Sequence, residues 1–304
     1  MRLAHAGVPS VRPRSILLGG GTVVGRREWR QRLERLLTSA GDVPAVAIGA
    51  GVEDPAFVGT RSYTSADELR QWAGLLRGFS AVTVRGPRSA ELLADVGLDV
   101  VVVGDPALAI EPDGGRPLTP SPGIVGVNVA LPEDVHGGDK QAVVQVVTGA
   151  VARLVEAGHE VRLLPMHPDD VAASRALVAA LPESDRARVR LVPVPRAPHD
   201  MVRLLGECEV VVGQRLHTVV LAAAAGVPAL AVSYRPKCRD FMLSLERPQW
   251  ALPSSGLQPQ AVADAVSELV ADRAEQAAHL AQRVGELRRR LRAAAATSLP
   301  ALTG

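Results

Sequence analysis

The feature that most constrains this chain is an alternation of short apolar runs with longer segments rich in Ala, Leu, Arg and Glu. The short runs have the length and β-branched content of buried strands, and the longer segments are typical of helices. Strands that are apolar along their whole length indicate parallel sheets covered by helices on both faces. The pattern therefore predicts a doubly wound α/β fold. Its predicted strands are Ser15–Leu18, Pro44–Ile48, Ala81–Val84, Val100–Val103, Ile124–Asn128, Glu160–Leu164, Val189–Val192, Val210–Val212 and Ala229–Val232.

The segment Pro106–Pro122 interrupts the alternation, because ALAIEPDGGRPLTPSP is rich in Pro and Gly and is typical of a linker. We expect an N-terminal α/β domain over residues 1–110, a linker over 111–122, a C-terminal α/β domain over 123–270, and a C-terminal helix and tail over 271–304. The last 40 residues are expected to form one long Arg-rich amphipathic helix. The other predicted helices are Arg26–Thr38, Ser65–Arg77, Pro87–Val96, Lys140–Ala157, Asp169–Ala180, His199–Leu205, Leu216–Ala225 and Pro236–Ser244.

Composition excludes several classes of protein. Apolar residues make up 47% of the 304 residues, which is too many for a disordered chain, and aromatics make up only 3%, too few for a single-strand nucleic-acid platform. A net charge of +2 argues against a DNA-backbone binder. Two cysteines, Cys208 and Cys238, cannot form a disulfide framework or a four-cysteine zinc site. Without a long apolar stretch or a signal-peptide core, we expect a cytoplasmic protein with no transmembrane helix.

Glycines follow the first predicted strand in Ile16–Gly25, ILLGGGTVVG. A strand that runs through Gly19–Gly21 into a helix would let bare backbone approach an anion, although many such turns are only tight turns. The spacing is neither GxGxxG nor a P-loop, so it does not indicate a dinucleotide site. Gly49-Ala50-Gly51 is expected to follow the next strand in the same way, so that both turns would line one crevice.

Arg85 is predicted to stand at the carboxyl end of a strand, in VTVRGPRSAELLADVG, with Pro87 as the first residue of a helix. An arginine at that position can hold a carboxylate or phosphate through two N–H donors, or it can be a surface side chain that caps the crevice. Asp105, after the following strand, could act as a cap, an ion-pair partner of Arg85 or a catalytic acid.

Arg215 and His217 stand where the strand ending at Gly213 leads into a helix of Ala, Leu and Val. Ionisable residues at the mouth of an apolar helix are costly unless they are used, and a helix N-terminus attracts anions. The sequence therefore predicts an anion site here, although a lone histidine is more often structural. Residues that could complete this pocket are Tyr234, Lys237 and Arg239.

The segment Pro165–Asp170, PMHPDD, places His167, Asp169 and Asp170 after another predicted strand. No second His or Cys lies at ligand spacing, and helix N-capping explains the acidic residues better than a metal does. We predict no metal.

Together these residues resemble the polysaccharide pyruvyl transferase family, from about Ser15 to Val270. The matching elements are GGGT, GAGVEDP, VRGPRSAELL with GDPAL, GVNVA, LPMHPDD and GQRLHTVVLAAAAGVPALAVSYRPK. The most specific part is the RLH element followed by a GVP turn and Tyr-x-x-Lys.

The resemblance implies two Rossmann-like domains in a GT-B-like arrangement, with acceptor binding on the N-terminal side and donor binding on the C-terminal side. Such enzymes take phosphoenolpyruvate (PEP) and place a pyruvate ketal on two hydroxyls of a cell-surface glycan, lipid-linked or free, with no further cofactor. The resemblance further implies catalytic roles for His217 and Arg215. The implied substrate contacts are Arg85, Leu216, Gly20, Gly21, Thr22 and Lys237.

The N-terminal side departs from the family pattern, since only about 15 residues precede the first predicted strand. We expect the N-terminal domain to be shortened, which puts acceptor binding in question more than donor binding. Two alternatives remain open. One is a GT-B-type glycosyltransferase that uses a nucleotide sugar, for which Glu246 is a poor candidate ribose ligand. The other is a non-catalytic member that binds a glycan or a protein. We expect no nucleic-acid partner and at most peripheral membrane contact.

Overall fold

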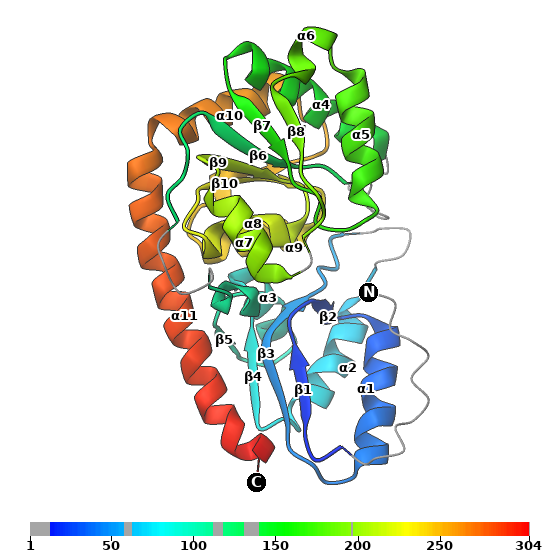
Figure 1. Ribbon diagram of the computed structural model, residues 1–304. Helices are drawn as coiled ribbons and strands as arrows, with labels where there is room; N and C mark the ends of the chain where they lie inside the picture. The colour runs from blue at the N-terminus through cyan, green and yellow to red at the C-terminus, as the bar shows by residue number, and fades with distance from the viewer. Residues whose placement is uncertain (1–12, 58–62, 112–117, 131–139, 196, 304) are drawn as a thin grey trace. The chain divides into compact units, whose positions relative to one another are not determined.

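The computed structural model describes residues 13–57, 63–111, 118–130, 140–195 and 197–303 (Figure 1). These residues divide into two compact units. Unit 1 takes the described residues up to Pro106 together with those after Arg288, and unit 2 takes those of Ala107–Arg288. All paired strands in the described residues of both units run parallel, as the apolar strand pattern predicts. The predicted linker residues 112–117 lie outside the described ranges.

Unit 1 contains one parallel sheet in the order β1-β3-β4-β5, with β2 paired to the far end of β3. Strand β3 is central, and Val46 and Ala47 on it are fully buried. Helix α2 begins where the Ser65 hydroxyl accepts a hydrogen bond from Glu68 N, an N-cap, and α3 begins with Pro87. The elements are β1 (Ile16–Gly19), β2 (Thr22–Val24), α1 (Arg27–Ala40), β3 (Ala45–Val52), α2 (Ala66–Leu76), β4 (Ala81–Val84), α3 (Pro87–Ala94) and β5 (Val101–Val102), with the 3-10 helix η1 (Pro106–Ala109) after them.

Unit 2 contains a parallel sheet in the order β11-β10-β9-β6-β7-β8. Helix α4 packs against α5 and α10, whereas α8 packs against α7 and α9, and Figure 1 shows these groups on opposite faces of the sheet. The strands are β6 (Ile124–Asn128), β7 (Glu160–Leu163), β8 (Val189–Leu191), β9 (Val210–Gly213), β10 (Ala229–Ser233) and β11 (Ala251–Pro253). The helices are α4 (Lys140–Glu156), α5 (Asp170–Ala180), α6 (Glu183–Arg186), α7 (Pro198–Gly206), α8 (Leu216–Ala224), α9 (Pro236–Ser244), α10 (Pro259–Ala271) and the 3-10 helix η3 (Pro248–Trp250).

The strand order of unit 2 is that of a Rossmann sheet. In chain order its strands read 6-5-4-1-2-3, which is the 3-2-1-4-5-6 arrangement seen from the other edge. Strands β7 and β8 are added on one side of β6, and β9, β10 and β11 on the other, so the order in which the strands are added reverses between β6 and β9. In open α/β sheets ligands bind at this switch point, outside the carboxyl ends of the strands.

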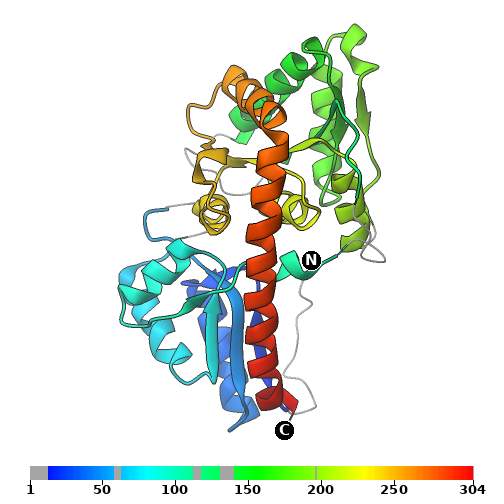
Figure 2. The ribbon, with the colours of Figure 1, turned by 90° about the vertical axis from the view of Figure 1, so that its left-hand side faces the viewer.

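The end of the chain forms two helices rather than the single helix that we predict for the last 40 residues. Helix α10 ends at Ala271, and α11 (Arg273–Thr303) begins after Asp272. In Figure 2, α11 appears as one long orange-to-red helix. Its residues after Arg288 belong to unit 1, where Arg290 Nη1 lies 3.4 Å from Val102 O. Among the described helices, none is long and apolar enough to cross a bilayer.

Both glycine clusters differ from their predicted settings. Gly19–Gly21 leads into strand β2 and not into a helix, and Gly20 and Gly21 both adopt positive φ in the turn. Gly49 and Gly51 lie inside β3, which continues to Val52, instead of forming a turn after it. The register of β3 against β4 shifts between Ala47 and Ala50, so Gly49, with φ +60°, occupies a bulge.

Replacing Gly49 by alanine is expected to destabilise the protein by more than about 2 kcal/mol, because the left-handed backbone alone costs a residue with a Cβ about 1–2 kcal/mol. The new Cβ would also lie 2.6 Å from Pro106 Cδ and 2.7 Å from Gly104 O. Gly74→Ala is the matched control: Gly74 lies in α2 with open space around it, so alanine should be neutral or stabilising there. Urea unfolding of both variants measures the difference, and equal effects would contradict this account.

Cys208 is expected to resist alkylation at pH 8 until the protein unfolds. The side chain is fully buried, and burial raises the pKa of its thiol to about 12 against the opposing charge of Arg162. The folded state therefore keeps this proton at a pH where the unfolded chain loses it, and stability falls as pH rises toward about 12. Iodoacetamide labelling of a Cys238→Ser variant, with and without urea, tests this. Rapid labelling without urea would show that the thiol is accessible.

Candidate functional site

The carboxyl ends of β6 and β9 meet at the switch point of unit 2. Asn128 is the last residue of β6, where it pairs with Gly213 at the end of β9. Gln214 and Arg215 follow Gly213 and lead into α8. The loop after β7 brings Asp170 to the same edge, since Asn128 Nδ2 donates to both Leu164 O and Asp170 Oδ2. Residues from three strand ends therefore converge at the position where the fold predicts a ligand.

Arg215 forms an ion pair with Asp170 at this edge. Arg215 Nε lies 2.8 Å from both carboxylate oxygens of Asp170, and Nη2 lies 2.5 Å from Oδ1. The Asp170 side chain is fully buried, whereas 31% of the Arg215 side chain is exposed. Burial lowers the pKa of the Arg215 guanidinium, but the hydrogen bonds and the charge of Asp170 outweigh it and keep this pKa above its ordinary value. Arg215 is therefore a permanently charged group with one solvent-facing side.

Gln214 connects the same strand ends. Its Oε1 accepts a hydrogen bond from Ala130 N at 2.8 Å, and its own backbone N donates to Asn128 O. The side chain is fully buried, and its Nε2 has no hydrogen-bond partner among the described residues. Sequence reasoning missed both residues as site candidates, although Asn128 is the last residue of one predicted strand and Gln214 lies two residues after the end of another.

Helix α8 begins at this site. Arg215 is its N-cap residue, and the first helical hydrogen bond runs from Thr218 N to Arg215 O. Leu216 and His217 precede that bond and form the first turn of the helix. The Leu216 side chain is buried in the core, so only its backbone N–H is placed to contact a ligand, whereas the His217 side chain is exposed. The turn thus combines a cation, an exposed imidazole and the positive end of a helix.

Three further predicted residues follow β10, the strand next to β9. Tyr234 is buried, and burial raises the pKa of its phenol well above the ordinary value, so it stays neutral. Lys237 is half-buried, and its Nζ lies 5.1 Å from the centre of the Tyr234 ring, a cation–π contact. Arg239 is exposed on α9.

Arg85, the predicted donor contact of unit 1, is buried. Its side chain is 1% exposed, with Nη2 3.2 Å from Thr22 Oγ1 and Nη1 3.4 Å from Asp105 Oδ2. Gly51 makes room for it, since a Cβ there would lie 2.6 Å from Arg85 Nη2. The structure thus confirms the Asp105 ion pair that the sequence left as one of three roles. Arg85 Nε has no hydrogen-bond partner in the described part of the chain.

Two more arginines at the same end of the unit 1 sheet pair with buried carboxylates. Arg26 Nε lies 2.9 Å from Glu53 Oε2, and Arg88 Nε lies 2.9 Å from Asp54 Oδ2. Glu53 and Asp54 follow the end of β3, within the GAGVEDP segment. Their position after a strand could have identified them as site candidates, but the sequence analysis did not select them. Near them, Gly21 is exposed, while Gly20 and Thr22 are half-buried.

The PMHPDD segment does not cap α5 as predicted. Asp169 precedes α5, but its side chain makes no cap hydrogen bond and instead lies 3.1 Å from His167 Nδ1 at an exposed position. Asp170 points back to its own loop and to Arg215. In the described residues no group of three His, Cys, Asp or Glu side chains is arranged to hold a metal ion.

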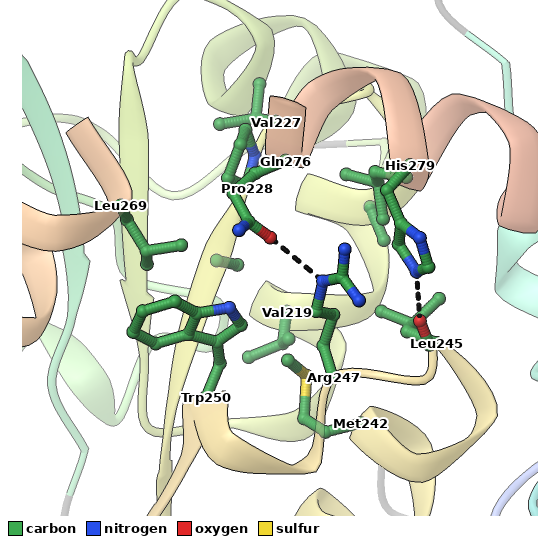
Figure 3. Close-up of a pocket in the computed structure, with 13 residues that line it drawn as sticks. Val219, Val227, Pro228, Met242, Leu245, Arg247, Trp250, Leu269, Gln276 and His279 are labelled. Atoms are coloured by element: carbon green, nitrogen blue, oxygen red, sulfur yellow. Dashed lines mark hydrogen bonds between the residues drawn. The ribbon is translucent and has the colours of Figure 1, made fainter. Parts of the chain in front are cut away.

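A small cavity of about 20 Å³ lies elsewhere in unit 2, bounded by α8, α9, α10 and α11 (Figure 3). It touches Ala229, the first residue of β10, and so lies at the opposite end of that strand from the site. Arg247 Nε donates to Gln276 Oε1 beside it, and His279 Nε2 lies 2.9 Å from Leu245 O (Figure 3). A volume of this size holds about one water molecule, which is too little for a substrate.

Several solved structures share this fold. A UDP-N-acetylglucosamine 2-epimerase from Listeria monocytogenes aligns over 95% of this chain and 75% of its own, with a TM-score of 0.59 and 14% identity. The MnaA–UDP co-structure from S. aureus aligns over 88% and 68%, with a TM-score of 0.54 and 15% identity. An α,α-trehalose 6-phosphate synthase from Burkholderia multivorans aligns over 90% and 75%, with a TM-score of 0.52 and 12% identity.

At such identities the likeness shows the fold alone, and it confirms the predicted α/β class with Rossmann-like, GT-B-type units. Sequence likeness identifies the family. The model of the polysaccharide pyruvyl transferase family matches residues 5–236, which include Arg215, His217 and the loops that hold them. This match covers most of the chain, and the protein therefore belongs to the polysaccharide pyruvyl transferase family, a family of transferase enzymes.

Proposed function

We propose that this protein transfers a pyruvyl group from PEP to two hydroxyls of a sugar in a polysaccharide or its precursor, forming a pyruvate ketal. The proposal rests on the charge, the exposure and the anchoring of the Arg215 side chain. It is a charged, partly exposed guanidinium anchored on the buried Asp170 at the start of α8, beside the exposed His217. A small donor that carries a carboxylate and a phosphate fits such a turn better than a neutral sugar does.

PEP carries a carboxylate and a phosphate, and both need N–H donors and positive charge. Arg215 offers its outer N–H groups, and the N-terminus of α8 adds the positive end of the helix dipole. Lys237 adds a second cation after the neighbouring strand β10. In unit 1, we assign donor or acceptor contacts to Gly20, Gly21 and Thr22. Arg85 Nε could contact PEP only after the Arg85 side chain moves, because that side chain is buried.

The reaction requires a proton at the methylene carbon of PEP. Protonation converts CH₂ to CH₃ and leaves C2 oxocarbenium-like, so that one sugar hydroxyl adds to C2 and loses its proton. The C2–O bond to phosphate then breaks, inorganic phosphate departs, and the second hydroxyl closes the ketal ring with loss of its own proton. One proton is taken up by carbon and two are released, one of which leaves with phosphate. We assign to His217 either the delivery of this proton or a hydrogen bond to the phosphate, since histidine is the side chain most often used for general acid–base catalysis.

Binding and turnover test the proposal separately. A saturating ligand at about 100 times its Kd stabilises a folded protein by about 2.7 kcal/mol, which thermal unfolding detects easily. PEP should raise the unfolding temperature, whereas UDP- and GDP-sugars should not. Release of inorganic phosphate with a glycan acceptor, and a ketal methyl signal by NMR, then establish transfer.

The alternatives predict different results in the same assays. A shift with a nucleotide sugar and none with PEP would replace the proposal by a glycosyltransferase. Binding of PEP without phosphate release, across a panel of bacterial cell-surface glycans, would indicate the non-catalytic role instead.

A further inference from the structure

We propose that Asp170 is a positioning residue of the donor site: it fixes the guanidinium of Arg215 in the orientation that binds the donor anion. This inference rests on the proposed function for the identity of the donor. The inference goes beyond the proposed function because it assigns a role to Asp170, an acidic side chain whose negative charge alone would oppose the binding of an anion.

Asp170 is fully buried, and its carboxylate is surrounded by hydrogen-bond donors. Its Oδ2 accepts from Met166 N at 3.0 Å and from His167 N at 3.2 Å, and lies 3.3 Å from Asn128 Nδ2. Arg215 supplies the remaining donors, on both oxygens. A buried carboxylate is costly unless its oxygens are paired, and these donors pair both oxygens of Asp170.

The same contacts fix Arg215. Its Nε and Nη2 point to Asp170, and within the described ranges of the chain Nη1 and the outer side of Nη2 remain for a ligand. Its backbone is held as well, because Arg215 N donates to Asn128 Oδ1 at 2.9 Å. An arginine side chain loses much rotational freedom on binding unless it is already ordered. Asp170 supplies that order before the donor arrives.

The Asp170→Asn variant tests whether Asp170 acts by orienting the Arg215 side chain or through its own negative charge. The asparagine oxygen would stay with Met166 N and His167 N, and its NH₂ group would then face the N–H groups of Arg215, donor against donor. If orientation dominates, KM for PEP should rise by about 10-fold to 100-fold, the range that loss of supporting partners costs at other ligand sites. If the negative charge of Asp170 mainly repels the donor anion, removing the carboxylate should lower KM for PEP, and this result would overturn the proposal.

A double-mutant cycle shows whether Asp170 acts through Arg215. In an Arg215→Ala background, Asp170→Asn should cause no further loss of PEP affinity, since its effect passes through the absent side chain. Equal losses in both backgrounds would identify a structural role only. Asp169→Asn is the matched control, because Asp169 is adjacent in sequence but exposed and bonded only toward His167 in the described structure. It should leave KM unchanged.

The wild-type protein gives a readout that needs neither PEP nor a variant at position 170. By NMR, the Arg215 Nε–H should exchange slowly with solvent, and its signal is assigned by its absence in Arg215→Lys. Exchange as fast as that of exposed arginines would overturn the proposal even if Asp170→Asn fails to fold. If the wild type neither binds nor turns over PEP, the proposed function fails, and this exchange rate alone decides whether Asp170 orders Arg215.

Discussion

Replacing Arg215 by alanine is expected, under the proposed function, to lower kcat/KM for PEP by about 10²-fold to 10⁴-fold, because the loss of two charge-assisted hydrogen bonds to a donor anion would cost about 1.5–3 kcal/mol each. Alanine also removes the charged partner of Asp170, which is fully buried. Steady-state phosphate release at varied PEP, with the acceptor held saturating, measures the change. Arg215→Lys keeps the charge but loses the planar pair of donors, so it should recover only a small part of the activity.

The same substitution has a stability cost that must be measured beside the kinetics. A buried carboxylate left without its partner costs about 3–5 kcal/mol, so Arg215→Ala should unfold at a lower temperature than the wild type. Arg175→Ala is the control, since Arg175 is exposed on α5, the helix that begins with Asp170. It should change neither property. A folded Arg215→Ala protein with full PEP turnover would show that this guanidinium does not hold the donor.

Sequence reasoning found five of the six strands described in unit 2, because a buried parallel strand needs an apolar residue at nearly every position, which is a local property. It missed β11, a three-residue strand at the edge of the sheet. It also found Arg215 and His217, since ionisable residues at the mouth of an apolar helix are visible in the sequence itself. It could not find the partner of Arg215. Asp170 lies 45 residues away, and only the adjacency of β6, β7 and β9 brings the two side chains together.

The errors in unit 1 have a similar cause. Gly49 and Gly51 have the composition of a turn, but their backbones continue a strand, because a bulge at Gly49 and the packing of Arg85 on Gly51 both require a missing Cβ. The burial of Arg85 depends on Thr22 and Asp105, which come from other segments of the chain. A single segment around Arg85 cannot show whether its guanidinium faces solvent or the interior.

Replacing His217 by alanine is expected to lower kcat by about 10²-fold to 10⁴-fold, the contribution of a positioned general acid, with a smaller change in KM for PEP. His217 is exposed in the first turn of α8, so truncation should leave the fold intact. The histidine must carry its proton to act as the acid. We therefore expect the pH dependence of kcat to differ between the wild type and the variant, as measured by phosphate release at saturating PEP.

His217→Gln distinguishes the two roles open to this side chain. Glutamine can donate a hydrogen bond to phosphate but cannot transfer a proton near neutral pH. If His217 is the acid, the glutamine variant should be as slow as the alanine variant. If His217 only holds the phosphate, glutamine should restore most of kcat. His159→Ala is the control, because His159 immediately precedes β7, at the opposite edge of the sheet from the site, and should retain wild-type turnover. Full activity in both His217 variants would exclude either role and leave Arg215 with the helix N-terminus as the donor site.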